Sequence, residues 1–125
     1  MARGSLQQIH PVLAVKDVTK ALSFYVDKLG FECIFSDHHL NPAYAGICRD
    51  QIEIHLQWHD EKEWDVTIDR PMLRIVTEHI EALFEEYSTK DVFHEHTALR
   101  ETPWGTKEFA FYDLYKNGLT FYVNL

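Results

Sequence analysis

The chain has 125 residues and a mass of 14.7 kDa, which suits one domain and is too short for two. A hydrophobic fraction of 46% and an aromatic fraction of 14% argue against a disordered chain and allow a sizeable core. The formal net charge of −8 argues against binding to a nucleic-acid backbone and is compatible with a cationic partner.

The cysteine content and hydropathy indicate where the protein works. Cys33 and Cys48 are too few for a disulfide framework or a zinc cluster, and both lie in apolar runs, so we expect reduced core residues. No run of about 18 apolar residues is present, and the N-terminus lacks the pattern of a secretion signal. We therefore expect a cytoplasmic protein without a membrane partner.

The first half of the chain predicts a strand, a helix and three further strands. Residues 9–15 alternate in the manner of a strand with one buried face. Asp17 is a candidate helix N-cap, and Gly30 is a candidate helix stop. Strand-like runs follow at residues 31–36, 44–48 and 52–58, the last two joined by a tight turn at 49–51.

The second half predicts the same order of elements. Residues 71–76 form a strand, and Thr77 is the expected cap of a helix that buries Ile80, Leu83, Phe84 and Tyr87. Further strands are predicted at residues 93–100, 108–112 and 119–123.

The two halves superimpose as a tandem repeat. Residues 10–15 fall on residues 70–75, 60 positions later, and residues 51–56 fall on residues 118–123. Chance similarity between amphipathic segments is the alternative, but six element types recur in the same order. We predict a single α+β domain over residues 1–125, with βαβββ repeats at about 8–58 and 69–124. Its two curved mixed sheets would surround a cavity, because a helix covers only one face of each sheet.

Strand alternation names the side chains on the face away from the helices. If Leu13 and Val15 pack under the first helix, then His10, Val12 and Ala14 point to the other side. The same rule places on this face Glu53, His55, Gln57, Arg70, Met72, Arg74, Thr120 and Tyr122. Because burying unpaired charges is costly, these groups must pair, meet water, bind a metal or bind a ligand.

Several stretches carry a family resemblance over roughly residues 8–124. His10-Pro-Val-Leu-Ala-Val-Lys-Asp, Ala21-Leu-Ser-Phe-Tyr and Lys28-Leu-Gly-Phe resemble the first βα unit of the glyoxalase, bleomycin-resistance and extradiol-dioxygenase (vicinal oxygen chelate) superfamily. The segments at residues 11–13, 44–50 and 103–110 resemble its bleomycin-resistance branch in particular.

The resemblance implies a test for a metal. Enzymes of this superfamily hold a divalent metal with one His or Glu from each of four strands, and the matching places here are His10, Glu53, Arg70 and Thr120. Arginine offers no lone pair and repels a cation, so we expect no metal, no cofactor and an Arg70–Glu53 ion pair in place of the metal. Two alternatives stay open: a slip would put Tyr122 in the place of Thr120, and another register would present His10, His55 and Tyr122 together.

Other catalytic chemistry has little support. The sequence has no nucleophile elbow and no glycine-rich phosphate loop, and we predict no catalytic residue. Aromatic side chains that offer stacking surfaces for a flat ligand are Phe35, Tyr44, Trp58, Trp64, Trp104, Phe109 and Tyr122. Trp104, between Pro103 and Gly105, resembles the tryptophan loop of bleomycin-resistance proteins, whose ligand groove lies between subunits.

Together with the absence of catalytic motifs, the resemblance implies a non-enzymatic, intertwined homodimer that sequesters a planar, cationic small molecule of the bleomycin type. The expected ligand-binding residues are Phe35, Tyr44, Glu53, His55, Arg70, Trp104 and Tyr122. Two alternatives are a metal-dependent lyase or dioxygenase with a shifted ligand set, and a structural or regulatory dimer whose own side chains fill the cavity.

Overall fold

A computed structural model describes residues 3–64 and 70–125, and it confirms the predicted α+β class. Repeat one contains β1 (Val12–Val15), α1 (Val18–Ser23), the π-helical turn η1 (Phe24–Lys28), β2 (Glu32–Ser36), β3 (Tyr44–Arg49) and β4 (Ile52–Trp58). The 3-10 turn η2 (Glu61–Glu63) follows it. Repeat two contains β5 (Met72–Val76), α2 (Ile80–Ser88), β6 (Arg100–Glu101), β7 (Thr106–Tyr112) and β8 (Gly118–Asn124).

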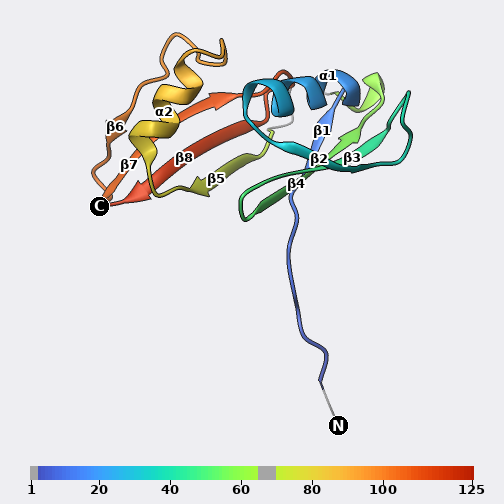
Figure 1. Cartoon of the computed structure of the whole chain (residues 1–125), viewed down its shortest axis with the longest axis horizontal. Helices are drawn as coiled ribbons and strands as arrows, with labels where there is room; N and C mark the ends of the chain where they lie inside the picture. The colour runs from blue at the N-terminus through green and yellow to red at the C-terminus, as the bar shows by residue number, and fades with distance from the viewer. Residues whose placement is uncertain (1–2, 65–69) are drawn as a thin grey trace.

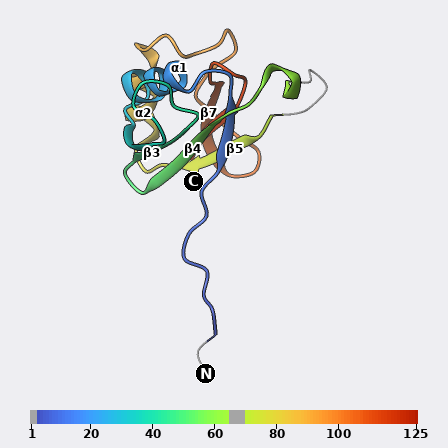
Figure 2. The same cartoon turned by 90° about the vertical axis from the view of Figure 1, so that its right-hand side faces the viewer.

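Each repeat forms one mixed four-stranded sheet. The strand orders are β1-β4-β3-β2 and β5-β8-β7-β6, and the first strand of each repeat runs parallel to the last. The two sheets lie side by side, with both helices on the same side (Figure 1). An N-terminal arm, residues 3–11, leaves from the other side and extends away from the body (Figures 1 and 2).

The helix-covered faces form the core, as the alternation predicts. Leu13 and Val15 on β1 are fully buried under the first helix, and Ile54 and Leu56 on β4 join them. Apolar burial of this kind is the main favourable term in folding. On the opposite face Val12 and Met72 are 46% and 47% exposed, so the helix-free faces of both sheets are open in the single chain.

The first helix begins and ends where the sequence predicts. The Asp17 side chain accepts a hydrogen bond from the Lys20 backbone N–H at 3.0 Å, and Gly30 takes a left-handed φ of +79°. Between them the helix widens into η1, and both Phe24 and Tyr25 are buried there.

Two local predictions in repeat two are wrong. The residue before α2 is His79 rather than Thr77, and it makes no side-chain capping bond. Of the strand expected at residues 93–100, only Arg100 lies in a strand, the two-residue β6, because Thr97 and His94 close a turn through their backbones. Phe93 still packs on Phe84 and Phe109, so a loop residue produced the apolar signal.

The register of the last strands also differs from the predicted superposition. Leu13 pairs with Leu56 in the first sheet, and Leu73 pairs with Leu119 in the second. If Leu13 corresponds to Leu73, Leu56 corresponds to Leu119 and not to Val123. A slip by an even number of residues leaves every side chain on its expected face, so alternation cannot detect it.

A buried polar network joins the two repeats at the β7–β8 turn. The Tyr25 hydroxyl donates to Asp113 Oδ2 at 2.7 Å, and Asn117 Nδ2 donates to Asp113 Oδ2 and to the Ala14 carbonyl, both at 3.0 Å. Burial raises the pKa of Tyr25 well above its ordinary value, and the neighbouring Asp113 raises it further. Tyr25 therefore remains a neutral donor across the seam.

We expect Tyr25→Phe to lower the free energy of unfolding by about 2 kcal/mol. The substitution keeps the ring but removes a buried hydrogen bond to a carboxylate. Urea denaturation followed by circular dichroism measures the change. Phe24→Leu is a comparison within the same turn, and a Tyr25→Phe protein as stable as the unchanged chain would contradict the role of this network.

The two cysteines are free, but one prediction about them is wrong. Cys33 is exposed on the edge strand β2, whereas Cys48 is half-buried on β3. Among the described residues, no helix has the length and apolar character needed to cross a membrane.

Candidate functional site

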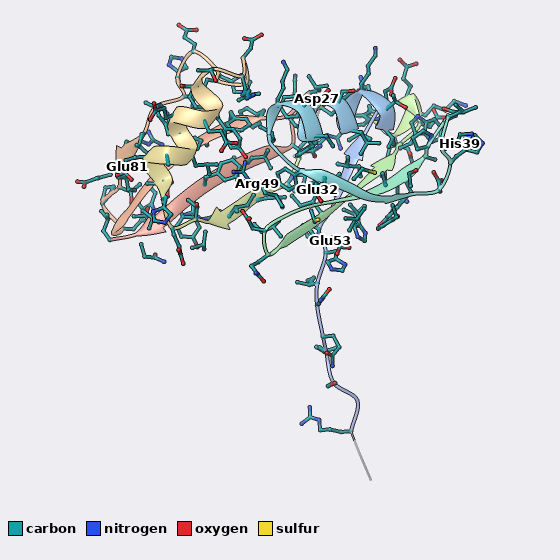
Figure 3. All side chains as sticks on the ribbon, viewed as in Figure 1. Asp27, Glu32, His39, Arg49, Glu53 and Glu81 are labelled. Carbon is teal, nitrogen blue, oxygen red and sulfur yellow. The ribbon has the colours of Figure 1, made fainter. Side chains whose placement is uncertain are left out.

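The helix-free face of the first sheet carries a cluster of five predicted or candidate side chains. We call His10, Phe35, Tyr44, Glu53 and His55 the first-sheet cluster. Glu53 and His55 lie two residues apart on β4 and point to the same side, while Tyr44 and Phe35 reach them from β3 and β2. Glu53 lies on the side away from the helices, near the point where the arm leaves (Figure 3).

Hydrogen bonds fix the centre of this cluster. His55 Nε2 lies 2.7 Å from Glu53 Oε2, and its Nδ1 lies 2.7 Å from the Tyr44 hydroxyl. His10 Nδ1 lies 3.6 Å from the same Glu53 oxygen, and its Nε2 lies 2.9 Å from Gln8 Oε1. Both imidazoles therefore point one nitrogen at the Glu53 carboxylate and hold the other against an oxygen.

A glycine makes room for the aromatic part of the cluster. A Cβ atom at Gly46 would lie only 2.1 Å from the Phe35 ring. The Phe35 ring can therefore lie across β3, stacked on Tyr44 at a 16° interplanar angle and edge-on to His55. The result is a flat aromatic surface, 43% exposed at Phe35.

Arg70 does not pair with Glu53, so that prediction is wrong. Among the described residues, the partners of the Glu53 carboxylate are His10 and His55 of its own sheet. The Arg70 guanidinium lies 4.1 Å from the centre of the Trp64 ring. Trp64 is itself held by a hydrogen bond from its indole N–H to the His59 carbonyl, so this arginine is stacked beside the connection between repeats.

The second sheet carries a separate polar cluster on its helix-free face. Glu108 Oε2 accepts hydrogen bonds from Arg74 at 3.0 Å and from Thr106 at 2.8 Å, and Arg74 lies 4.4 Å from the centre of the Tyr122 ring. Burial raises the pKa of Glu108, but the hydrogen bonds from Arg74 and Thr106 outweigh it and leave the pKa below its ordinary value. We call Arg74, Thr106, Glu108 and Tyr122 the second-sheet cluster.

Sequence reasoning missed Glu108. Glu108 alternates with Phe109 and Phe111, which pack in the core. A strand with Phe at every second position has its remaining side chains on the opposite face. That signal places Glu108 on the helix-free side.

The other predicted aromatics divide into exposed and structural residues. Trp104 is 65% exposed on the turn before β7, where Gly105 has a φ of +85°. Trp58 is 48% exposed at the end of β4. Phe109 is 2% exposed and packs beneath α2, so its predicted role as a stacking surface is wrong.

The four places that the superfamily resemblance suggests for a metal do not form one site. His10 and Glu53 lie together, but Arg70 stacks on Trp64, and the Thr120 hydroxyl donates to Met72 Sδ at 3.1 Å. Tyr122, the alternative to Thr120, lies against Arg74 in the second-sheet cluster. The residues in these four places therefore do not fit a metal shared between both sheets.

A crevice of about 550 Å³ separates the β3–β4 turn from β5 and α2. At its edge Arg49 forms a bidentate ion pair with Glu86, at 2.8 and 3.0 Å, and also donates to the Leu29 carbonyl at 2.7 Å (Figure 3 labels Arg49). The Tyr87 hydroxyl donates to the same carbonyl at 2.8 Å. These contacts at the edge of the crevice join the two repeats.

Comparisons with known proteins agree with this architecture. A bleomycin resistance protein of Geobacillus stearothermophilus is 29% identical over an alignment 134 residues long, which covers 96% of this chain and 98% of the relative. The protein of that name from Staphylococcus aureus matches equally. The bleomycin-binding protein of Streptomyces verticillus, solved with copper(II)-bleomycin, is 28% identical, with a TM-score of 0.77 over 95% of this chain and 97% of the other.

A further solved structure supports the fold alone. A family model gives the family of the chain. The bleomycin resistance determinant of transposon Tn5 has a TM-score of 0.79 at 17% identity, covering 95% of this chain and 98% of the other. The family model described as "Glyoxalase superfamily protein" matches residues 2–124. The chain therefore belongs to the glyoxalase superfamily.

Proposed function

We propose that the protein is a cytoplasmic homodimer that sequesters a planar, cationic small molecule of the bleomycin type, without catalysis, on its helix-free faces. The observation that carries the proposal is a stacked aromatic pair on the helix-free face of the first sheet, together with an exposed tryptophan on the turn before β7. Phe35 and Tyr44 form a stacked pair, and Trp104 is 65% exposed. Relatives that cover nearly the whole chain are named for bleomycin resistance or bleomycin binding.

Stacking and charge both favour such a ligand. Aromatic side chains bind flat π-systems by offset or edge contacts, and an exposed ring loses little on desolvation. The net charge of −8 attracts a cation over a distance, and the carboxylates of Glu53 and Glu108 lie on the ligand-facing sides of the two sheets.

The N-terminal arm supports a dimer. Leu6 is 102% exposed and Ile9 is 92% exposed, so the arm presents apolar side chains that its own chain does not cover. The end of the arm that joins the body lies beside the first-sheet cluster, since His10 belongs to both. We propose that each arm packs on a second copy and that the helix-free faces of the two copies enclose the ligand groove.

Titration with metal-free bleomycin and with copper(II)-bleomycin tests the ligand. We expect saturable heat release and quenching of tryptophan fluorescence, with a dissociation constant at or below about 10 µM, which corresponds to roughly 7 kcal/mol. If neither heat release nor quenching is observed at ligand concentrations up to ten times higher, the assignment of a bleomycin-like ligand is overturned.

We expect Trp104→Ala to weaken bleomycin binding by about 1–3 kcal/mol, roughly 5- to 150-fold, because it removes an exposed stacking surface. Since the side chain is mostly solvent-exposed, the thermal midpoint should stay the same. Calorimetric titration measures the affinity. Trp64→Phe is the matched control, because Trp64 is already covered by Arg70. Equal affinities of the Trp104→Ala and unchanged proteins would exclude Trp104 from the ligand site.

A further inference from the structure

The first-sheet cluster contains a geometry that the proposed ligand site does not require. One nitrogen from each of His10 and His55 and one oxygen of Glu53 lie within 4.8 Å of one another. Two imidazoles and a carboxylate are a donor set found in protein zinc sites, and these donors also suit other divalent transition metals. We propose that His10, Glu53 and His55 form a transition-metal site built on the first sheet alone.

Two of the three donor separations lie near those of a tetrahedral ion, and all three donor atoms lie within 4.8 Å of one another. Zinc binds imidazole nitrogen and carboxylate oxygen at about 2.0–2.2 Å, so two of its ligands lie roughly 3.3 Å apart. His10 Nδ1 is 3.6 Å from Glu53 Oε2, close to that separation. His55 Nε2 is 2.7 Å from the same oxygen, so this hydrogen bond opens by about half an ångström when the ion replaces its proton.

The outer hydrogen bonds of both imidazoles set the correct nitrogen toward the ion. A metal-binding histidine usually donates its other N–H to an oxygen, which fixes the ring and its tautomer. His55 Nδ1 has the Tyr44 hydroxyl as this partner at 2.7 Å, and His10 Nε2 has Gln8 Oε1 at 2.9 Å. With Nδ1–H of His55 directed at Tyr44 and Nε2–H of His10 directed at Gln8, both inner nitrogens can present a lone pair once the ion replaces the hydrogen between His55 and Glu53.

The surroundings leave room for an ion and for a further ligand. A hollow of about 380 Å³ lies beside the site, lined by arm residues 8–10, by the β3–β4 turn and by Cys48, which pairs with Glu53 across the strands. Arg70, expected from the sequence to repel a cation here, lies on Trp64 instead. Three protein donors with an open side toward solvent resemble the arrangement in which zinc keeps a position for water or an exogenous ligand.

This site differs from the four-strand arrangement that the superfamily resemblance implies. All three donors belong to repeat one or its arm, and His55 occupies none of the four matched places. The second repeat contributes Arg74 and Tyr122 to a cluster of its own. The two proposals share Tyr44, Glu53 and His55, but they are tested separately, because the titration with metal-free bleomycin contains no transition metal.

Zinc titration of the chelator-treated, dialysed protein by calorimetry tests the site. We expect one zinc ion per chain with a dissociation constant at or below about 10 µM, a rise in the thermal midpoint, and no comparable effect of magnesium, which prefers oxygen ligands. Copper(II) in place of zinc should give an electron paramagnetic resonance spectrum with coupling to two nitrogens. Lack of saturable zinc binding would overturn the proposal.

Variants separate this site from adventitious binding. His10→Ala and Glu53→Gln should weaken zinc binding at least tenfold, and His10 lies outside the strands, so its replacement leaves the sheet intact. Tyr44→Phe removes an outer partner and should weaken binding about 10- to 100-fold. Gln57→Ala on the same strand face and His39→Ala in a loop are matched controls that should bind as the unchanged protein does. Zinc affinity that survives both His10→Ala and Glu53→Gln would place the ion elsewhere and refute the site.

Discussion

We expect the Leu6→Asp/Ile9→Asp double variant to be a monomer under conditions in which the unchanged protein is a dimer. Both side chains are fully exposed in the single chain, on an arm that extends away from the body (Figure 2). Burying one such side chain contributes about 1.5–3 kcal/mol, and a dimer buries two from each arm. Losing even half of this burial free energy raises the dissociation constant of the dimer by at least about 100-fold.

Light scattering after size-exclusion chromatography measures the effect as a fall from about twice 14.7 kDa to 14.7 kDa. Gln7→Asp is the matched control, since it adds a negative charge to the same arm without removing an apolar side chain. If the groove lies between subunits, the double variant also loses bleomycin affinity at protein concentrations below its dimer dissociation constant. An unchanged protein that is monomeric at about 10 µM, a concentration at which a specific dimer is normally formed, would refute the dimer itself.

A double variant that remains dimeric would show that the arms do not hold the dimer together. The two copies would then associate through another surface, and the exposed Leu6 and Ile9 would have no part in assembly. Bleomycin affinity measured on that same variant shows whether the arm contributes to the ligand site directly.

The sequence predicts which side of each strand faces the core better than it predicts which residues lie opposite one another. Alternation correctly places Leu13 and Val15 under the helix, and His55 and Tyr122 on the other face. Register depends on how far each strand slides along its neighbour, and a slide by an even number of residues conserves the faces. For that reason the superposition that matched Leu56 with Val123 was wrong.

Four of the seven residues predicted to bind a ligand lie together in the fold, but the expected pairing of Arg70 with Glu53 is absent. Phe35, Tyr44, Glu53 and His55 do lie together, whereas Arg70 and Tyr122 lie against other partners. The match to the superfamily's metal places, together with opposite charge, suggested that Arg70 would meet Glu53. In the fold, the Trp64 ring lies against the arginine, and two histidines of the first sheet hold the carboxylate.

The match to the superfamily's places allowed one residue from each strand, so only His10 and Glu53 counted as donors there. His55 entered only as an alternative, in a register that joined it to His10 and Tyr122. His55 follows Glu53 by two residues on β4 and therefore shares its face, which brings a third donor to the cluster.

The largest loss of stability should follow from Tyr87→Ala. Tyr87 is 1% exposed, and its ring lies between 5.5 and 6.4 Å, centre to centre, from the rings of Phe109, Phe111 and Phe121. Truncating a buried aromatic side chain costs about 3–5 kcal/mol, since it removes apolar contacts and leaves a cavity. The substitution also takes one partner from Arg49, which bridges the repeats.

Tyr87→Phe separates the ring from the hydroxyl. Burial raises the pKa of Tyr87 to about 12, so the hydroxyl is a neutral donor to the Leu29 carbonyl across the physiological range. That carbonyl also accepts from Arg49, so the phenylalanine variant leaves it bonded and should cost only about 1 kcal/mol. Urea unfolding followed by tryptophan fluorescence gives both values. A Tyr87→Ala protein destabilised no more than Tyr87→Phe would show that the aromatic core of repeat two closes around the missing ring, and that the seam between repeats depends on the Arg49–Glu86 pair instead.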